Sequence, residues 1–157
     1  MRESPCTLQT NIPLPFEILS LQEESDLELP LMQSCVAAGF PSPADNYLED
    51  HVNLQRLLIS NPSATYLVRV RGESMIDARL YDGDLLVVDR SLEAQSGQVI
   101  IGVVDGEFTV KQLVLRGDVF YLQPANQQYP PLKLTDEMDF KPWGVVVWSL
   151  HKIKRNL

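Results

Sequence analysis

The stretch QVIIGVVDGEFTVKQLVL, residues 98–115, decides the fold class of this 157-residue chain. Two apolar runs rich in β-branched residues, Gln98–Val104 and Glu107–Leu115, flank the dipeptide Asp105-Gly106. This dipeptide between two such runs is the strongest short-range signal for a hairpin. The stretch therefore predicts two antiparallel strands joined by a tight turn at Asp105-Gly106.

Further short strands are predicted on both sides of this hairpin. They cover Thr65–Arg71, Asp84–Asp89, Val119–Gln123 and Val145–Leu150, with a second tight turn at 116–118. One short helix is predicted at Asn53–Ser60, where leucines recur at helical spacing and Asn53 can cap the first turn. Many short strands with tight turns and little helix predict a mainly β fold, a compact rolled sheet or small barrel.

The first 43 residues differ in composition from the remainder. They hold six of the eleven prolines, and residues 1–40 carry six acidic side chains against one basic side chain. Proline interrupts helices and central strands, so this part predicts an extended arm in which a helix over 17–27 is only weakly indicated. We expect residues 1–43 to form the arm and residues 44–157 to form one folded domain.

Composition excludes several classes of protein. Hydrophobic residues make up 45% of the chain, but no apolar run approaches the roughly 20 residues of a membrane helix. Two cysteines, Cys6 and Cys35, and two histidines, His51 and His151, are too few and too scattered for a metal site. A net charge of −8 argues against direct binding to nucleic acid. We expect a cytoplasmic protein without a secretory signal, metal or cofactor.

Ser74 and Lys111 are the candidates for chemistry. Ser74 lies in Arg71-Gly72-Glu73-Ser74-Met75, where the predicted strand Thr65–Arg71 ends, and a glycine two residues earlier allows a tight turn with free N–H groups. Lys111 lies inside a predicted apolar strand and is the first lysine of the chain. Taken separately, a serine after a strand is more often a turn residue, and a lysine in a strand is more often exposed.

A lysine can activate a serine hydroxyl only if it loses its proton. At the reference pKa of about 10.4, only about one lysine in a thousand is neutral near pH 7. Burial that lowers the pKa by about 3 units makes about half of it neutral. The sequence alone does not establish that the two side chains meet.

The order of several motifs resembles the LexA/UmuD self-cleaving peptidases. The resemblance rests on Gly72-Glu73-Ser74-Met75, on the DGDLLVVD stretch at 82–89 and on the DGEFTVK stretch at 105–111. The segments GFPSPADNY at 39–47 and NPSATY at 61–66 point to the UmuD branch. The resemblance runs from about Leu29 to the C-terminus and implies the mainly β fold of LexA and signal peptidase, in a domain that dimerises.

The resemblance also implies functional residues and partners. Ser74 falls on the family's nucleophile, Lys111 on its general base, and Ala38–Gly39 on its self-cleavage bond, while the Ser74 N–H is our candidate oxyanion donor. The implied partners are a second copy of the chain, RecA filaments on single-stranded DNA and a UmuC-type polymerase subunit. The segment Leu29-Pro30-Leu31-Met32 loosely resembles the arm segment that contacts the sliding clamp.

Two other functions stay open at this point. A LexA-type transcriptional regulator or antirepressor also inactivates itself by cleavage, although residues 1–28 do not resemble a helix-turn-helix domain. A pure interaction module with a vestigial site is the third possibility. The sequence does not establish whether the arm reaches its own active site or that of its partner.

Overall fold

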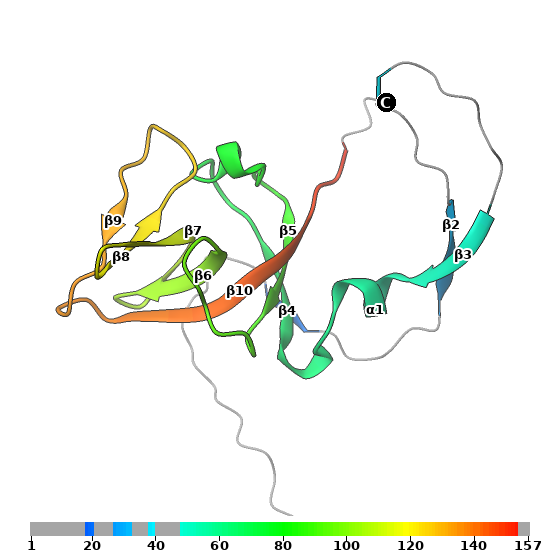
Figure 1. The fold of residues 1–157 in the computed structure, drawn as a ribbon, viewed down its shortest axis with the longest axis horizontal. Coiled ribbons are helices and arrows are strands. Elements are labelled where there is room, and N and C mark those ends of the chain that lie inside the picture. The colour runs from blue at the N-terminus through cyan, green and yellow to red at the C-terminus, as the bar shows by residue number, and fades with distance from the viewer. Residues whose placement is uncertain (1–17, 21–26, 33–37, 40–47, 154–157) are drawn as a thin grey trace, which may run out of the picture.

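The structure is a computed structural model that describes residues 18–20, 27–32, 38–39 and 48–153 (Figure 1). These residues form mostly short strands, with one short α-helix and two 3-10 turns. The elements are β1 (Ile18–Ser20), β2 (Glu28–Met32), β3 (Leu48–Asn53), α1 (Leu54–Leu58), η1 (Pro62–Ala64), β4 (Thr65–Arg69), η2 (Ile76–Ala78), β5 (Leu85–Asp89), β6 (Val99–Val104), β7 (Glu107–Arg116), β8 (Val119–Gln123), β9 (Leu132–Lys133) and β10 (Phe140–Leu150).

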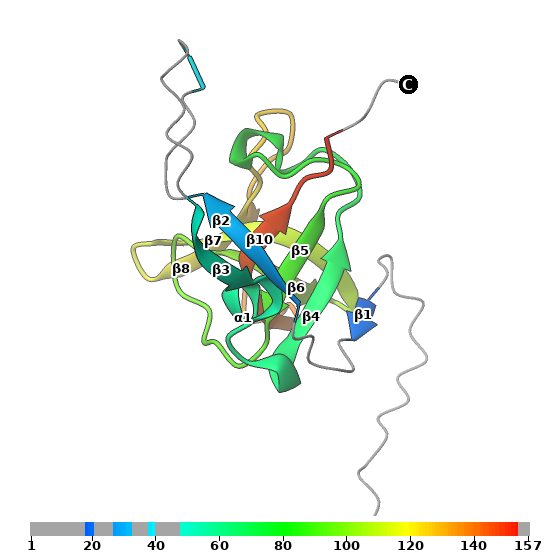
Figure 2. The same ribbon diagram turned by 90° about the vertical axis from the view of Figure 1, so that its right-hand side faces the viewer.

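Eight of these strands form one antiparallel sheet, in the order β1-β4-β5-β10-β6-β7-β8-β9. Strands β2 and β3 form a separate two-stranded hairpin. Figures 1 and 2 show that the large sheet is strongly twisted and curled, while the β2–β3 hairpin lies beside it. The prediction of a mainly β fold built from a rolled sheet is confirmed.

The curl brings strands that are distant in the sheet order together around one core. Buried side chains of β4, β5 and β6 pack in a single cluster, and half-buried side chains of β7 pack against it. Strands β4 and β7 are separated by three strands in the sheet, so they can share this core only because the sheet rolls over. Removing this apolar surface from water is the main stabilising contribution to the fold.

The predicted hairpin at residues 98–115 is confirmed. Strands β6 and β7 pair from Val99 with Gln112 to Val104 with Glu107. Asp105 and Gly106 between them have φ of 50° and 86°. Both values are positive, as the two central residues of a type I′ turn require. The second predicted turn is confirmed as well, since β7 and β8 pair up to Arg116 and Val119.

The last strand begins earlier than predicted. The sequence predicts Val145–Leu150, whereas β10 runs from Phe140 to Leu150. Pro142 argues against a central strand because it cannot donate a hydrogen bond to the ladder. The structure accommodates it at an irregularity where the pairing of β10 with β6 shifts register between Pro142 and Gly144.

The predicted short helix is confirmed, whereas the helix in the arm is not. Helix α1 lies within the predicted Asn53–Ser60, and the Asn53 side chain accepts the Arg56 N–H at 3.1 Å. The weakly indicated helix over 17–27 is wrong at residues 18–20, which form β1 and pair with β4. Cys6, Cys35 and the predicted boundary at residues 43 and 44 lie outside the described residues. No helix in the described part of the chain has the length and apolar character needed to span a membrane.

Candidate active site

Ser74 lies in a loop that connects β4 to β5. Contacts of the residues before and after Ser74 hold this loop in place. Gly72 has a φ of 88°, a conformation that other residues rarely adopt, and its N–H donates to Asp82 Oδ1 at 2.8 Å. The Met75 side chain, 1% exposed, anchors the residue after Ser74 in the core. The nucleophile candidate is therefore held by a turn on one side and by a buried side chain on the other.

The far end of this loop is also tied to the sheet. The Asp84 carboxylate is buried, accepts the Tyr81 N–H at 2.9 Å and lies 2.6 Å from His151 Nδ1. Nothing in the local sequence singles out His151, because its partner is 67 residues away and the two meet only where β10 pairs with the neighbouring β5, at Leu150 and Leu85. His151 is thus placed to hold the loop that carries Ser74 to the end of β10.

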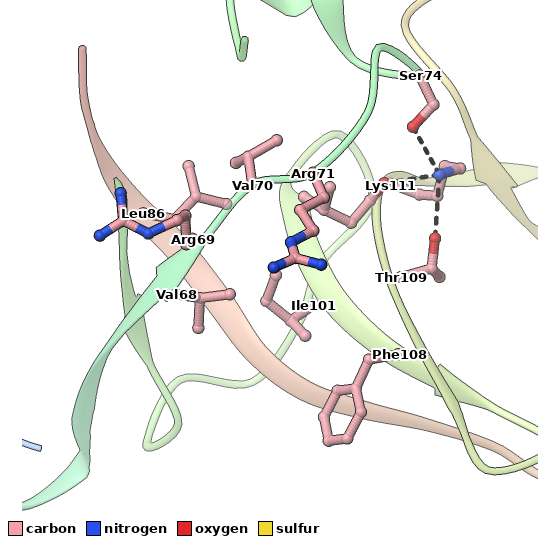
Figure 3. Close-up of a pocket in the computed structure, with 11 residues that line it drawn as sticks. Val68, Arg69, Val70, Arg71, Ser74, Leu86, Ile101, Phe108, Thr109 and Lys111 are labelled. Carbon is pink, nitrogen blue, oxygen red and sulfur yellow. Dashed lines mark hydrogen bonds between the residues drawn. The ribbon is translucent and has the colours of Figure 1, made fainter. Parts of the chain in front are cut away.

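Lys111 reaches Ser74 from strand β7. Its Nζ lies 2.9 Å from Ser74 Oγ, 3.0 Å from Thr109 Oγ1 and 2.9 Å from the Val110 carbonyl oxygen. Figure 3 shows Ser74 and Thr109 on opposite sides of the amine. The two residues that the sequence proposed for chemistry, 37 positions apart, are therefore in direct contact.

The surroundings of Lys111 favour its neutral form. Burial lowers the pKa of Lys111 from its usual 10.5, because the charged amine loses hydration. Among the described residues no carboxylate pairs with it to offset this loss. A neutral amine has two N–H donors and one lone pair. Thr109 Oγ1 and the Val110 carbonyl can take the two donors, which leaves the lone pair to accept the Ser74 hydroxyl proton.

A cavity of about 240 Å³ opens beside the Ser74–Lys111 pair. Figure 3 shows the pair at one end and Phe108 at the other. The lining is mostly apolar: Val68, Arg69, Val70, Arg71, Ser74, Leu86, Ile101, Phe108, Thr109, Val110 and Lys111. A mostly apolar cavity with a few convergent polar groups is typical of a binding site.

The walls of this cavity offer backbone edges to an extended chain. Strand β8 pairs with β7 only from Gln112 onward, and β1 pairs with β4 only at 66–68. Thr109–Lys111 on one wall and Val70–Arg71 on the other therefore have no partner strand on that side among the described residues. An extended peptide can add to such edges through main-chain hydrogen bonds.

The predicted cleavage bond lies outside this cavity. Ala38 and Gly39 form a bend and are both exposed, and neither lines the cavity. In Figures 1 and 2 their short cyan segment lies beyond the β2–β3 hairpin, away from the large sheet. The structure thus brings Ser74 and Lys111 together but does not bring Ala38–Gly39 to them.

Three further predictions concern the Ser74 N–H, the clamp segment and metal binding. Within the described residues the Ser74 N–H donates to no carbonyl or side chain, so it is available to a substrate oxygen. Leu29 and Leu31 of the possible clamp segment lie in β2 and are exposed. Among the described residues no group of three His, Cys, Asp or Glu side chains could hold a metal ion.

A curled β-sheet that holds a serine hydroxyl against a desolvated lysine has the arrangement of a serine peptidase that uses lysine as its base. Comparison with known protein families agrees with this class. Residues 30–147 match the family described as Peptidase S24-like, which is most of the chain. The chain belongs to the Peptidase S24-like family.

Individual relatives place the chain within this family. It is 44% identical to protein MucA of Salmonella typhimurium over 123 residues, which are 78% of this chain and 84% of MucA. It is 41% identical to protein ImpA of Escherichia coli over 125 residues, 80% of this chain and 85% of ImpA. A LexA repressor of Xylella fastidiosa is 41% identical over 127 residues, 81% of this chain but only 59% of the repressor. The chain is thus similar to MucA and ImpA over nearly their whole length.

Proposed function

We propose that this chain is a self-cleaving serine peptidase of the UmuD type, cut at Ala38–Gly39 by Ser74 and Lys111. The observation that carries the proposal is the 2.9 Å contact between Lys111 Nζ and Ser74 Oγ in a half-buried site. Cleavage releases residues 1–38 from residues 39–157. The division into an arm, residues 1–43, and a peptidase domain, residues 44–157, is part of this proposal.

The reaction follows from the donors and acceptors of the site. Neutral Lys111 takes the Ser74 hydroxyl proton while Ser74 Oγ attacks the Ala38 carbonyl carbon. The Ser74 N–H donates to the oxygen that becomes negative. The C–N bond to Gly39 then breaks, and Lys111 returns the proton to the departing Gly39 amine. Neutral Lys111 then activates a water molecule. This water hydrolyses the ester between Ser74 and Ala38, and Ser74 Oγ regains its proton from Lys111.

The cavity suits the proposed substrate. Ala38 is small enough for a 240 Å³ cavity that must also hold the neighbouring backbone, and Gly39 lets the main chain approach Ser74 closely. The free edges at Thr109–Lys111 and Val70–Arg71 can bind the arm as an added strand. A tethered arm binds at a high effective concentration once it reaches the cavity.

Cleavage therefore requires that Ala38–Gly39 enter a cavity that lies apart from it in this structure. Either the segment between β2 and β3 rearranges within one chain, or the arm of a second copy delivers the bond. We propose that a RecA filament on single-stranded DNA favours the delivered state. A ligand that binds this state more tightly than the other increases its population by at most the ratio of the two affinities.

We further propose that the trimmed chain acts as a dimer with a UmuC-type polymerase subunit that copies damaged DNA. The C-terminal half of β10 offers a dimer surface, since β6 pairs with β10 only up to Val145. Beyond that residue Val147 and Trp148 are 40% and 44% exposed. Because the chain has a net charge of −8, we assign contact with nucleic acid to these partners rather than to the chain itself.

A LexA-type regulator is the second candidate, favoured by the 41% identity to a LexA repressor. The match covers 59% of that repressor, and residues 1–40 carry six acidic side chains and one basic side chain. An acidic arm is unsuited to binding DNA. Sequence-specific binding of the uncut chain to duplex DNA, lost after cleavage, would favour the regulator.

Self-cleavage is tested by incubating the purified full chain at about pH 10, close to the reference pKa of lysine. Mass spectrometry should then find two fragments, one that ends at Ala38 and one that begins at Gly39. Ser74→Ala and Lys111→Ala should each abolish both fragments. A wild-type chain that stays intact, with and without a RecA filament, would contradict the proposal.

A further inference from the structure

Asn126, in the loop after β8, is a buried side chain that the proposed reaction does not yet use. It is 8% exposed, whereas the neighbouring Gln127 and Gln128 are exposed. Its Nδ2 donates to the Glu73 carbonyl at 2.9 Å, and its Oδ1 accepts the Gln128 N–H at 2.9 Å. Both polar atoms of the Asn126 side chain are therefore hydrogen-bonded. Its Nδ2 holds Glu73, the residue directly before Ser74.

The Glu73 carbonyl and the Ser74 N–H belong to the same peptide group. This group is planar and trans, because the described chain has no cis peptide bond. The carbonyl and the N–H of a trans peptide point in opposite directions. A bond that fixes the Glu73 carbonyl toward Asn126 therefore also fixes the direction of the Ser74 N–H, away from Asn126.

Other contacts between the two loops hold the chain only after Ser74. The Asp77 N–H donates to the Ala125 carbonyl at 2.8 Å, and the Ala125 N–H lies 3.4 Å from Met75 Sδ. Within the described residues the only other donor to the Glu73 carbonyl is the Ile76 N–H, at 3.4 Å. This contact is longer than an ordinary N–H···O bond. The orientation of the peptide before Ser74 thus depends mainly on Asn126.

We propose that Asn126 is a positioning residue that aims the Ser74 N–H at the oxygen of the attacked carbonyl. The inference rests on the proposed self-cleavage and adds to it a residue of another loop, 52 positions after Ser74 in the sequence. An oxyanion donor stabilises the transition state only if its direction is set before the reaction begins. Asn126 contributes this direction without touching the substrate.

The test compares self-cleavage of the full chain in two variants over a range of pH. Asn126→Asp keeps the shape and the acceptor for the Gln128 N–H but cannot donate when ionised. Asn126→Ala removes the donor without adding charge. Gln127→Glu is the control, because it makes the same amide-to-acid change at the adjacent exposed position.

Both Asn126 variants should slow the first-order cleavage at high pH by about 10- to 1,000-fold, because a lost oxyanion donor costs about 100- to 1,000-fold and a misdirected one costs less. Gln127→Glu should cleave at the wild-type rate. The pH midpoint of Asn126→Ala should equal that of the wild type, because Asn126 has no contact with Lys111. The ¹H–¹⁵N signal of the Ser74 amide should shift in Asn126→Ala. If that variant unfolds at the assay temperature, Asn126→Asp supplies the rate and the amide signal but not the pH midpoint, because its added charge acts on Lys111 as well.

Two results would overturn the inference. One is cleavage by both Asn126 variants within about twofold of the wild-type rate, a change too small for a lost oxyanion donor. The other is a rate loss in Asn126→Ala that comes with a shifted pH midpoint, which would place its effect on Lys111. In either case the wild type still cleaves, so the proposed function survives. A wild-type chain that never cleaves would refute the proposed function and this inference together.

Discussion

Lys111 Nζ has three short contacts that differ in what they can do for the amine. Ser74 Oγ can donate its hydroxyl proton, whereas the Val110 carbonyl oxygen can only accept and Thr109 Oγ1 accepts here. Two acceptors and one donor match a neutral amine. Three predictions at the residue scale follow from this match.

The first concerns replacement of Lys111 by arginine. Arginine keeps the positive charge and much of the length, but it cannot be deprotonated at any pH that the protein tolerates. Lys111→Arg should therefore lower the rate of self-cleavage by about 100- to 10,000-fold, the usual contribution of a general base. The rate should show no rise with pH. Cleavage by this variant at more than a tenth of the wild-type rate would mean that the lysine acts only through its charge.

The second concerns stability. In the folded chain the Lys111 pKa lies below 10.5, whereas in the unfolded chain it is ordinary. Between these two values the unfolded state binds more protons, so the free energy of unfolding rises with pH in this window. In a Ser74→Ala background, Lys111→Met should remove that rise and should be more stable than the lysine form at neutral pH. Urea denaturation at several pH values measures the difference, which should shrink as the pH approaches 10.5.

The third concerns Thr109. Thr109→Val keeps the shape but removes an acceptor that favours the charged amine more than the neutral one. The pH midpoint of cleavage should move to lower pH, while the rate at high pH should fall about tenfold because one N–H no longer holds the amine in place. Thr109→Ser keeps Oγ and should resemble the wild type in both respects. An unchanged pH profile in Thr109→Val would contradict the assigned contact.

At this scale the sequence predicted the two reactive side chains better than their supports. Ser74 and Lys111 could be proposed because a glycine-containing turn and a lysine in an apolar strand are unusual, and because both fall on a family motif. Asn126 and His151 carry no such local signal. Asn126 acts through a contact between two loops, and His151 through a partner on the neighbouring strand that is 67 positions away in the sequence.

At the scale of elements, strand β10 shows where close packing restricts the sequence. A Cβ added to Gly144 would lie 2.6 Å from Val88 Cγ1 and 3.3 Å from the Asp89 carbonyl oxygen. Neither the core side chain nor the backbone of β5 has room to move away freely.

Gly144→Ala should therefore lower the free energy of unfolding by about 1–3 kcal/mol, as overpacking of a core does. The measurement is urea denaturation in a Ser74→Ala background, which prevents cleavage. Gly39→Ala serves as the control, because its added Cβ would meet nothing within 4 Å. A Gly144→Ala chain as stable as its parent would show that β5 and β10 are not packed as closely as described.

The elements that the sequence predicted are those with strong local signals. The β6–β7 hairpin follows from Asp105-Gly106, and α1 follows from leucine spacing and the Asn53 cap. The start of β10 could not be predicted, because Pro142 is tolerated only through a register shift that depends on the neighbouring strand. Strand β9 has two residues and β1 three, too short for any periodic pattern, and they form only against existing edges.

At the scale of the whole molecule, the apolar surface at the end of β10 should mediate the proposed dimer. Trp148→Asp would place a charge in that surface, where an unpaired carboxylate loses its hydration. The variant should sediment as a monomer at concentrations where the wild type is a dimer. Tyr129→Asp is a matched control, since Tyr129 is also an aromatic side chain with 44% exposure but lies between β8 and β9, outside β10. Dissociation by both variants, or by neither, would place the dimer surface elsewhere.

The proposed cleavage bond and the reactive pair lie apart in the folded chain. Ala38–Gly39 lies outside the cavity, while β1, in the same arm, is paired with β4 at the edge of that cavity. An uncut chain can therefore be stable although its reactive pair is already assembled. The sequence could suggest the bond and the pair, but not their separation, because no local sequence pattern indicates where an arm will dock.

The proposed self-cleavage requires that Lys111 release its proton readily because folding has removed water from its amine. NMR titration of the lysine side chains, in full-length Ser74→Ala protein, measures this property directly. We predict that the Lys111 pKa lies below 10.5 in the folded protein and that unfolding in urea raises it again. A Lys111 pKa that does not change when the protein unfolds would contradict the proposed role of Lys111 as the base.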